Sequence, residues 1–163
     1  MADSLQVSTT RDEISGFLTG LNDAFKDMSP VTKAVGKVLK ANIDKRFTTK
    51  TDPAGKEWKE WKLSTKEARA AEALVTGKTY TLLEHYGELH RSLAAIADKK
   101  SIEVGFGVVW SKYHEQIDPA YPESDWLAHR RLIFDNREGD LSQSDQADVL
   151  AAAMDTLRVR LKL

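Results

Sequence analysis

Apolar residues recur at helical spacing in two stretches near the start of the chain. In the first stretch, Thr10 and Glu13 form a capping box ahead of an apolar face, which predicts a helix over residues 11–28. In the second, Ser29-Pro30 is typical of an N-cap followed by the first helical residue, and an apolar stripe continues to about residue 47. The apolar positions are Ile14, Phe17, Leu18, Leu21, Phe25 and Met28 in the first helix, and Val31, Val35, Val38, Leu39, Ile43 and Phe47 in the second.

A polar connection, TTKTDPAGKEW, follows the second helix, and its Asp-Pro-Ala-Gly segment supplies the geometry of a turn. Ser64 and Glu67 form another capping box, which predicts a short alanine-rich helix from residue 65 to about 74. Residues 75–88 combine two glycines with the helical-looking stretch TYTLLEHY, so they fit no single element.

The apolar period then changes from helical spacing to two. Residues 89–96 alternate, the turn-like Asp98-Lys99-Lys100 follows, and residues 102–106 alternate again, which predicts a β-hairpin. Residues 108–113 are expected to continue into another strand, and LAHRRLIFD at 127–135 to return as one more. Between these strands, residues 117–128 contain two prolines and several acids, which indicates a long exposed loop.

The chain is expected to end in a helix that begins near residues 142–145. Its apolar seam is Leu150, Met154, Leu157 and Leu161, and the basic residues of its last turns suit the negative end of the helix dipole. The element order predicts an α+β fold, in which N-terminal helices and a C-terminal helix pack on an antiparallel β-sheet. We expect one domain over residues 1–163, with residues 1–10 as a flexible arm.

Composition bounds the class of protein. The chain has 163 residues, of which 41% are hydrophobic and 30% charged, values typical of a globular domain with a real core. It contains no cysteine, which excludes disulfides, thiolate metal sites and a cysteine nucleophile. Nowhere does an apolar run approach the ~18 residues of a membrane span, and the start lacks the pattern of a secretory signal. A soluble protein of the cytoplasm is expected.

Charge is unevenly distributed, although the formal net charge is only −1. Residues 31–78 hold 12 Lys and Arg against 6 Asp and Glu, whereas residues 114–148 hold nine acids and three arginines. Such segregation can be no more than a solvated surface, or it can let the basic face of one copy meet the acidic face of another. A purely nucleic-acid-binding domain would more usually be basic overall.

Catalytic and metal-binding patterns are absent from the sequence. The four histidines show no HExxH or HxH spacing, and His85 and His90 lie five apart rather than four. No GxSxG motif or phosphate-binding glycine loop occurs, and no pair of carboxylates is spaced for acid–base work. We therefore expect no enzyme, no catalytic residue, no metal and no cofactor.

The stretch DPAGKEWKEWKLST, residues 52–65, concentrates tryptophan and lysine. Interleaved rings and cations are typical of single-strand binders, so a nucleic-acid accessory role for residues 56–66 is the alternative function. The competing interpretation is that the rings pack on the core while the lysines reach solvent or a partner. Under that interpretation Trp58 is buried beneath the turn, and Lys56, Lys59, Lys62 and Trp61 face a neighbouring subunit or a tail protein.

Three stretches resemble the phage virion morphogenesis, or tail completion, family of contractile-tailed phages of the Mu and P2 type. The first runs from Phe47 through DPAGKEW to Ser64-Thr65, and the second is YGELHRSLAAIADKKSIEVGF. The third is YHEQ at 113–116 with HRRLIF at 129–134. The likeness spans roughly residues 44–163, with the two N-terminal helices in the expected place. Departures include Trp61 in place of Pro-Leu and the acidic loop 117–128 in place of a shorter connection.

The resemblance implies a structural role in the virion. Such proteins complete or terminate the tail and help join it to the head, as a ring, expected to be a hexamer, that contacts tail tube, sheath or head-connector proteins. Assembly would take place in the host cytoplasm, with neither membrane nor nucleic acid as a partner. The expected interface combines the basic region with the acidic one through Lys56, Lys59, Trp61, Lys62, Asp118, Glu123, Asp125, Arg130 and Arg131.

Overall fold

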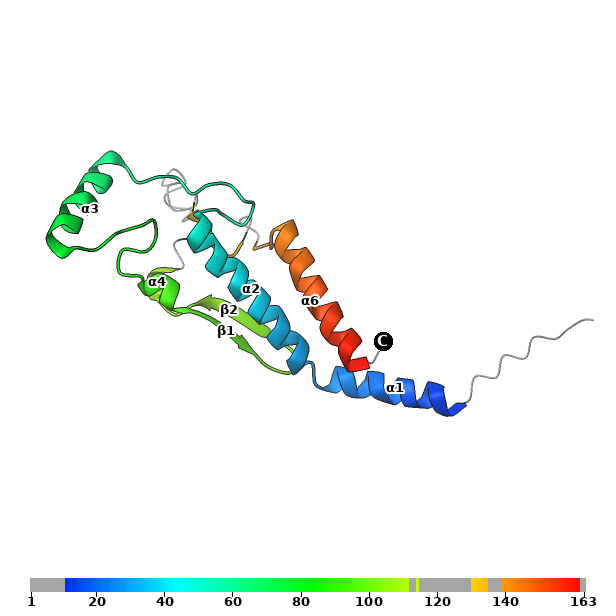
Figure 1. Ribbon diagram of the computed structural model, residues 1–163. Coiled ribbons are helices and arrows are strands. Elements are labelled where there is room, and N and C mark those ends of the chain that lie inside the picture. The colour runs from blue at the N-terminus through cyan, green and yellow to red at the C-terminus, as the bar shows by residue number, and fades with distance from the viewer. Residues whose placement is uncertain (1–10, 112–113, 115–129, 135–138, 162–163) are drawn as a thin grey trace, which may run out of the picture.

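The computed structural model describes residues 11–111, 114, 130–134 and 139–161. Within this part of the chain, helix α1 (Arg11–Lys26) projects from one end of an elongated body and α3 (Leu63–Thr76) lies at the other (Figure 1). Between them lie α2 (Ser29–Thr49), a hairpin of β1 (Leu93–Ala97) and β2 (Ile102–Phe106), and α6 (Gln143–Leu161). The predicted α+β class is confirmed.

Helix α2 is the central element, because it packs against the hairpin on one side and against α6 on the other (Figure 1). Gly36 lies on the side of α2 that faces the hairpin. A Cβ atom at this position would clash with Cδ1 of Ile102, so the missing side chain lets helix and strand approach closely.

The β-hairpin forms as the sequence predicts, with antiparallel pairs from Leu93 with Phe106 to Ala97 with Ile102. Asp98 shapes its turn, since its Oδ1 atom accepts hydrogen bonds from the backbone N–H groups of Lys100 (2.6 Å) and Ser101 (2.7 Å). These bonds hold the pKa of the Asp98 carboxyl below its ordinary value. The first strand starts later than predicted, because Glu88–Arg91 form the short helix α4.

The hydrophobic core gathers side chains from α2, α4, the hairpin and the segments that connect them. Trp58 and Phe47 meet edge to face, with ring centroids 5.8 Å apart, and Phe106 meets Phe47 in the same way at 6.1 Å. The buried cluster consists of Ile43, Phe47, Trp58, Leu82, Leu89, Leu93 and Leu132. The C-terminal half of the α2 stripe therefore supplies the centre of the core, as its spacing indicates.

The two further predicted strands are wrong where the structure describes them. Residues 109–111 form a 3₁₀ helix, η1 (Val109–Ser111), and residues 130–134 have no strand. Apolar and β-branched residues favour strands, but a strand also needs a neighbouring strand with which to pair. Within the described residues the sheet has two strands, β1 and β2. The predicted loop at 117–128 and the proposed arm at 1–10 lie outside the described residues.

Two predicted helix caps are also wrong. Helix α3 begins at Leu63 after Lys62, without a side-chain cap, so Ser64 lies inside the first turn. Helix α2 begins at Ser29 rather than after it, and the backbone N–H of Ser29 donates to Asp27 Oδ1 at 3.0 Å. Helix α2 therefore begins one residue earlier, and α3 two residues earlier, than the capping patterns indicate.

Helix α6 starts where the sequence places it, with Ser142 Oγ accepting the backbone N–H of Asp145 at 3.2 Å. Its predicted apolar seam is wrong in the N-terminal half, because Leu150 is 63% exposed and Met154 44% exposed. The buried carboxylate of Asp145 instead forms an ion pair with Arg46 of α2, and Arg46 also donates to the carbonyl of Leu132 at 2.6 Å.

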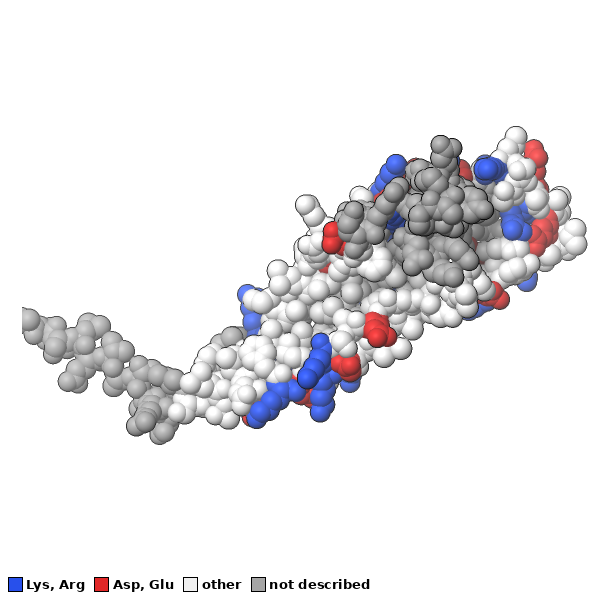
Figure 2. Space-filling model, turned by 180° about the vertical axis from the view of Figure 1, so that it is seen from behind, with Lys and Arg blue, Asp and Glu red and all other residues white. Residues whose placement is uncertain are grey.

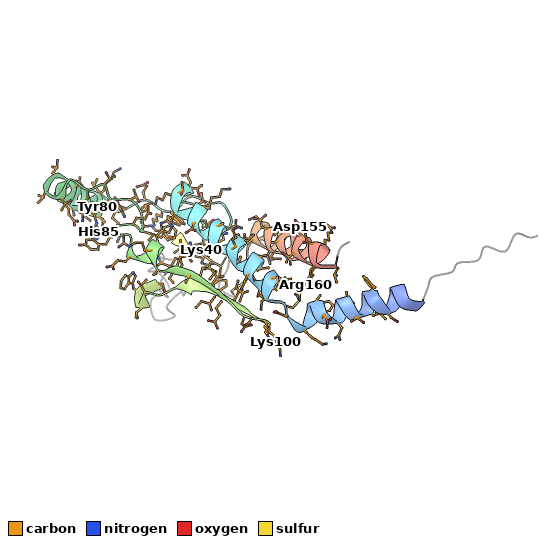
Figure 3. The ribbon with its side chains drawn as sticks, turned by 60° about the horizontal axis from the view of Figure 1, so that its bottom comes forward. Lys40, Tyr80, His85, Lys100, Asp155 and Arg160 are labelled. Atoms are coloured by element: carbon orange, nitrogen blue, oxygen red, sulfur yellow. The ribbon has the colours of Figure 1, made fainter. Side chains whose placement is uncertain are left out.

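The apolar stripe of helix α1 is largely exposed to solvent. Phe17 is 47% exposed, Leu18 57% and Phe25 59%, whereas Ala24 is buried against the body. The guanidinium of Arg160, near the end of α6, donates to the carbonyl of Asp27, and Figure 3 places it where the two helices meet. No helix in the described parts of the chain is both long and apolar enough to cross a membrane.

Candidate functional site

The turn after α2 positions the tryptophan and lysine stretch. Lys50 ends α2 in the left-handed conformation, with φ of 57°, and its carbonyl accepts the N–H of Trp58 at 2.7 Å. Trp58 is 3% exposed, its Nε1 donates to the carbonyl of Arg131 at 3.3 Å, and the Lys50 ammonium lies 5.7 Å from its ring centre. The predicted burial of Trp58 beneath the turn is confirmed.

A network of polar side chains connects the segment before α4 to α2. Lys50 Nζ donates to Glu84 at 2.6 Å, and the two nitrogens of His90 meet Glu84 at 3.1 Å and Asp44 at 3.0 Å. The His90 ring also stacks on Phe47, with centroids 4.2 Å apart. Burial opposes the ionisation of Asp44 and Glu84. Hydrogen bonds outweigh this effect, from Lys40 and His90 to Asp44 and from Lys50 and Thr81 to Glu84. The pKa of each carboxyl therefore lies below its ordinary value.

A second polar cluster connects α3 to the segment that follows it. Glu72 receives hydrogen bonds from Arg69 (2.7 Å) and the Tyr80 hydroxyl (3.2 Å), and its Oε2 lies 2.9 Å from His85 Nε2. Hydrogen bonds with His85 first, and Arg69 second, keep the pKa of Glu72 low. Figure 3 shows Tyr80 and His85 together at the α3 end of the molecule, with ring centroids 4.8 Å apart.

A cavity of about 660 Å³ lies beside these two polar clusters, between α3, α4 and the main body. Its walls include the rings of Trp61, Tyr86 and Trp110. Four cations and two carboxylates border it as well: Lys59, Lys62, Arg69, Arg130, Glu60 and Glu88. A cavity of this size that combines aromatic walls with charged groups is typical of a binding site for a ligand or for a partner side chain.

His114 and Arg130 form the buried wall of this cavity, and they are 8% and 6% exposed. Arg130 Nε donates to the carbonyl of Lys59 at 2.9 Å, which joins the wall to the lysine stretch. Burial, assisted by the charge of Arg130, lowers the pKa of His114 to about 4, so the imidazole is neutral at pH 7. His114 Nδ1 has no hydrogen-bond partner among the described residues.

The structure brings together four of the nine interface residues expected from the sequence. Lys59, Trp61, Lys62 and Arg130 border the cavity. Lys56 is exposed on the adjacent turn, where its backbone N–H donates to Asp52 Oδ1 at 2.8 Å. Arg131 is half-buried and contributes its carbonyl to Trp58. Three residues of the set, Asp118, Glu123 and Asp125, lie outside the described residues.

Sequence reasoning missed the other half of the cavity. The sequence assigns no site role to Arg69 or His85 and places Trp110 in a strand, yet all three border the same space. The clustering of aromatic residues between positions 80 and 114 was the available signal, but no local pattern showed that α3 would fold over them. Basic and acidic side chains are interspersed at this end of the molecule (Figure 2), which breaks up the basic region seen in the sequence.

The described residues thus form an α+β body with an aromatic and cationic cavity at one end. Comparison with known families supplies the assignment: the model of the phage virion morphogenesis family matches residues 10–117. The chain therefore belongs to the phage virion morphogenesis family. Neither the curated proteins nor the solved structures gave a match.

The matched region starts earlier and ends sooner than the resemblance seen in the sequence. It includes α1 and α2, the turn with Trp58, the α3 segment and the hairpin. Arg130, Arg131 and α6 lie beyond it. Most of the cavity therefore belongs to the family-matched part, whereas Arg130 is contributed by the part that follows.

Proposed function

We propose that this protein is a non-enzymatic structural component that completes or terminates the phage tail and helps to join it to the head. Membership of the phage virion morphogenesis family carries the proposal. The protein acts at the head–tail junction of the virion, where it contacts tail tube, sheath or head-connector proteins. Its assembled form is a ring, and six copies would match the symmetry of the tail.

A ring of identical copies requires two different complementary surfaces on each subunit, because its interfaces are head-to-tail. The lysines of the 56–62 stretch supply one such surface. Lys56, Lys59 and Lys62 are all exposed, and Lys59 and Lys62 border the same cavity as the half-buried ring of Trp61. Charged side chains around an apolar anchor give an interface its register, while the anchor supplies affinity.

Removing the gene from the parent phage tests the role directly. Electron microscopy of the resulting lysate is expected to show filled heads together with separate tails, because unfinished tails do not join heads. Complete, infectious particles in that lysate would overturn the proposal.

Reversing the charge of the lysine surface tests the interface. The triple substitution Lys56→Glu, Lys59→Glu and Lys62→Glu should abolish ring formation on tails while leaving the monomer folded, because these exposed ammonium groups contribute little to stability. Negative-stain microscopy of complemented lysates and circular dichroism of the purified variant provide the two measurements. A matched control reverses three exposed lysines of α2, Lys33, Lys37 and Lys45, and should assemble normally.

The alternative function, nucleic-acid binding through residues 56–66, receives less support from the geometry. It requires two stacking rings, but Trp58 is 3% exposed and occupied by the core. Phosphate-driven binding falls steeply with salt. A salt titration of any binding to single-stranded DNA therefore separates the two functions.

A further inference from the structure

We propose that the cavity beside α3 is a docking pocket that takes the acidic, aromatic stretch 117–128 of a second copy of this chain. This inference rests on the proposed ring, and it names the two surfaces that meet there. The pocket is built from described residues alone, and the case for its occupant rests on chemical complementarity.

The walls of the pocket suit an aromatic side chain. Trp61 from the stretch before α3, Tyr86 from the segment before α4 and Trp110 from η1 surround one space of about 660 Å³. Aromatic rings that meet edge to face or offset gain more than their buried area alone provides. Such a space accommodates a tyrosine or tryptophan together with parts of its neighbours.

The rim of the pocket suits carboxylates. Lys59 and Lys62 are exposed at its edge, and Arg69 lies half-buried on α3. Four cations against two carboxylates give the lining an excess of positive charge. Flexible ammonium groups at a rim attract an acidic segment and orient it before the anchor enters.

One buried polar atom in the pocket still needs a partner. His114 is 8% exposed, it lines the pocket, and its Nδ1 makes no hydrogen bond to any described residue. A buried polar group without a partner costs free energy, which an incoming hydroxyl or amide group would recover. This atom indicates a ligand that brings hydrogen-bonding groups as well as an apolar surface.

The chain itself contains a stretch of the required chemistry. Residues 117–128, IDPAYPESDWLA, carry Tyr121 and Trp126 among the acids Asp118, Glu123 and Asp125, with no lysine or arginine. Every copy therefore carries both a cationic, aromatic pocket and an acidic, aromatic segment. Two unlike surfaces on one chain are what a head-to-tail ring requires.

A nucleic acid fits the same pocket less well. Glu60 and Glu88 border it, and each would repel a phosphate group. The formal net charge of −1 provides no long-range attraction for a polyanion. An acidic peptide carries fewer and more widely spaced charges, which the cations at the rim can meet individually.

A peptide titration tests the pocket. The probe is a fluorescein-labelled dodecapeptide with the sequence of residues 117–128, and the receptor is the full chain carrying Asp118→Asn, Glu123→Gln and Asp125→Asn, so that its own segment competes weakly. Fluorescence anisotropy should show saturable binding. Adding Lys59→Glu and Lys62→Glu to the receptor should weaken this binding about tenfold or more, because two attractive charges at the rim become repulsive.

Two controls isolate the pocket. Lys33→Glu with Lys37→Glu makes the same change of net charge at exposed positions of α2, and this receptor should bind as before. A peptide with its three acids replaced by their amides should bind weakly to every receptor. Equal binding by the pocket variant and the α2 variant would overturn the proposal.

Mixing two variants tests whether the segment comes from a second copy. One variant carries Lys59→Glu and Lys62→Glu, and the other carries the neutralised segment. Each alone lacks one of the two surfaces, but a mixture retains one intact pocket and one intact segment on different copies. Sedimentation velocity should therefore show a 1:1 dimer only in the mixture, and monomers throughout would overturn the assignment to a second copy.

A labelled twelve-nucleotide oligothymidine serves as the competing probe. If it binds the receptor and displaces the peptide, and Lys59→Glu with Lys62→Glu removes this binding, the pocket holds nucleic acid and the proposal is wrong. These results are separable from the role in the virion. A phage lacking the gene would still release separate heads and tails if the pocket bound nothing.

Discussion

At the scale of single residues, His114 shows how burial, assisted by a neighbouring cation, sets a protonation state. Its imidazole lies in the pocket wall beside the Arg130 guanidinium, and burial lowers its pKa to about 4. The unfolded chain binds this proton near the ordinary histidine pKa of 6.5, whereas the folded chain does not. Between pH 6.5 and about 4 the unfolded state therefore holds more protons, and stability falls as the pH falls.

We predict that His114 contributes about 2–3 kcal/mol to the loss of unfolding free energy between pH 7 and 4.5. The variant His114→Gln should show a correspondingly flatter stability profile in urea titrations over this interval. NMR titration of the His114 Hε1 resonance provides an independent check, because the ring should remain neutral until about pH 4. Parallel stability profiles for the two proteins would contradict the assignment.

At the scale of elements, α6 is attached to α2 through a buried ion pair as well as by apolar packing. The Asp145 carboxylate is 1% exposed, and besides Arg46 it accepts a hydrogen bond from Asn42 Nδ2 at 2.9 Å. Arg46 in turn donates to Leu132, so one pair joins two helices and the segment at 130–134. A buried pair of this kind is costly to break from one side, since the remaining charge is left without compensation.

We predict that Asp145→Ala lowers the free energy of unfolding by about 3–5 kcal/mol. Asp155→Ala is a matched control on the same helix, because Asp155 is exposed and its ion pair with Arg158 spans 3.6 Å; this change should cost less than about 1 kcal/mol. Guanidinium unfolding curves of the two variants make the comparison. Replacing both partners, Arg46→Met with Asp145→Leu, should restore much of the loss, and a double variant as unstable as Asp145→Ala would argue against the charge mechanism.

Sequence patterns predicted the elements better than their contacts. The helical spacing in 11–28, 29–47 and the C-terminal stretch, and the alternation around Asp98, each correspond to a helix or strand of the structure. Such patterns report the local chain, and the hairpin pairs with itself. Residues 108–111 also have strand propensity, but among the described residues no neighbouring strand pairs with them, and they form η1.

The face of a helix that becomes buried was harder to predict. The alanines at 151–153 leave several faces of α6 similarly apolar, so the leucine and methionine spacing selected the wrong face at Leu150 and Met154. The face that meets α2 carries the Asp145 carboxylate, and no hydrophobic pattern marks an acid as a core residue. The site shows the same limit: Lys59, Trp61 and Lys62 were found together in the sequence, but Arg69 and Trp110 were not, because their proximity depends on how α3 folds back.

At the scale of the whole molecule, the body and its N-terminal helix are only partly joined. Side chains 15–20 of α1 are all exposed, and the attachment to the body begins near Ala24, with Arg160 donating to the carbonyls of Asp23 and Asp27. The apolar stripe of α1 therefore contributes little to the stability of the isolated chain.

We predict that deleting residues 1–20 leaves the free energy of unfolding within about 0.5 kcal/mol of the full chain, as for surface changes in general. Thermal unfolding followed by circular dichroism measures this. The substitution Ala24→Asp in the full chain is the contrasting case, because it places a carboxylate at a position that is 2% exposed and should destabilise clearly. A deletion variant that unfolds as readily as Ala24→Asp would show that α1 supports the core.

The bond between Arg46 and Asp145 joins residues 99 positions apart, and this separation matters while the protein is being made. Synthesis proceeds from the N-terminus, so α2 and the hairpin can pack before α6 has been translated. Until then, the guanidinium of Arg46 lacks the carboxylate that neutralises it, and full burial of that face of α2 is unfavourable. A chain terminated before Asp145 leaves Arg46 without this partner, so stable folding depends on the translation of α6.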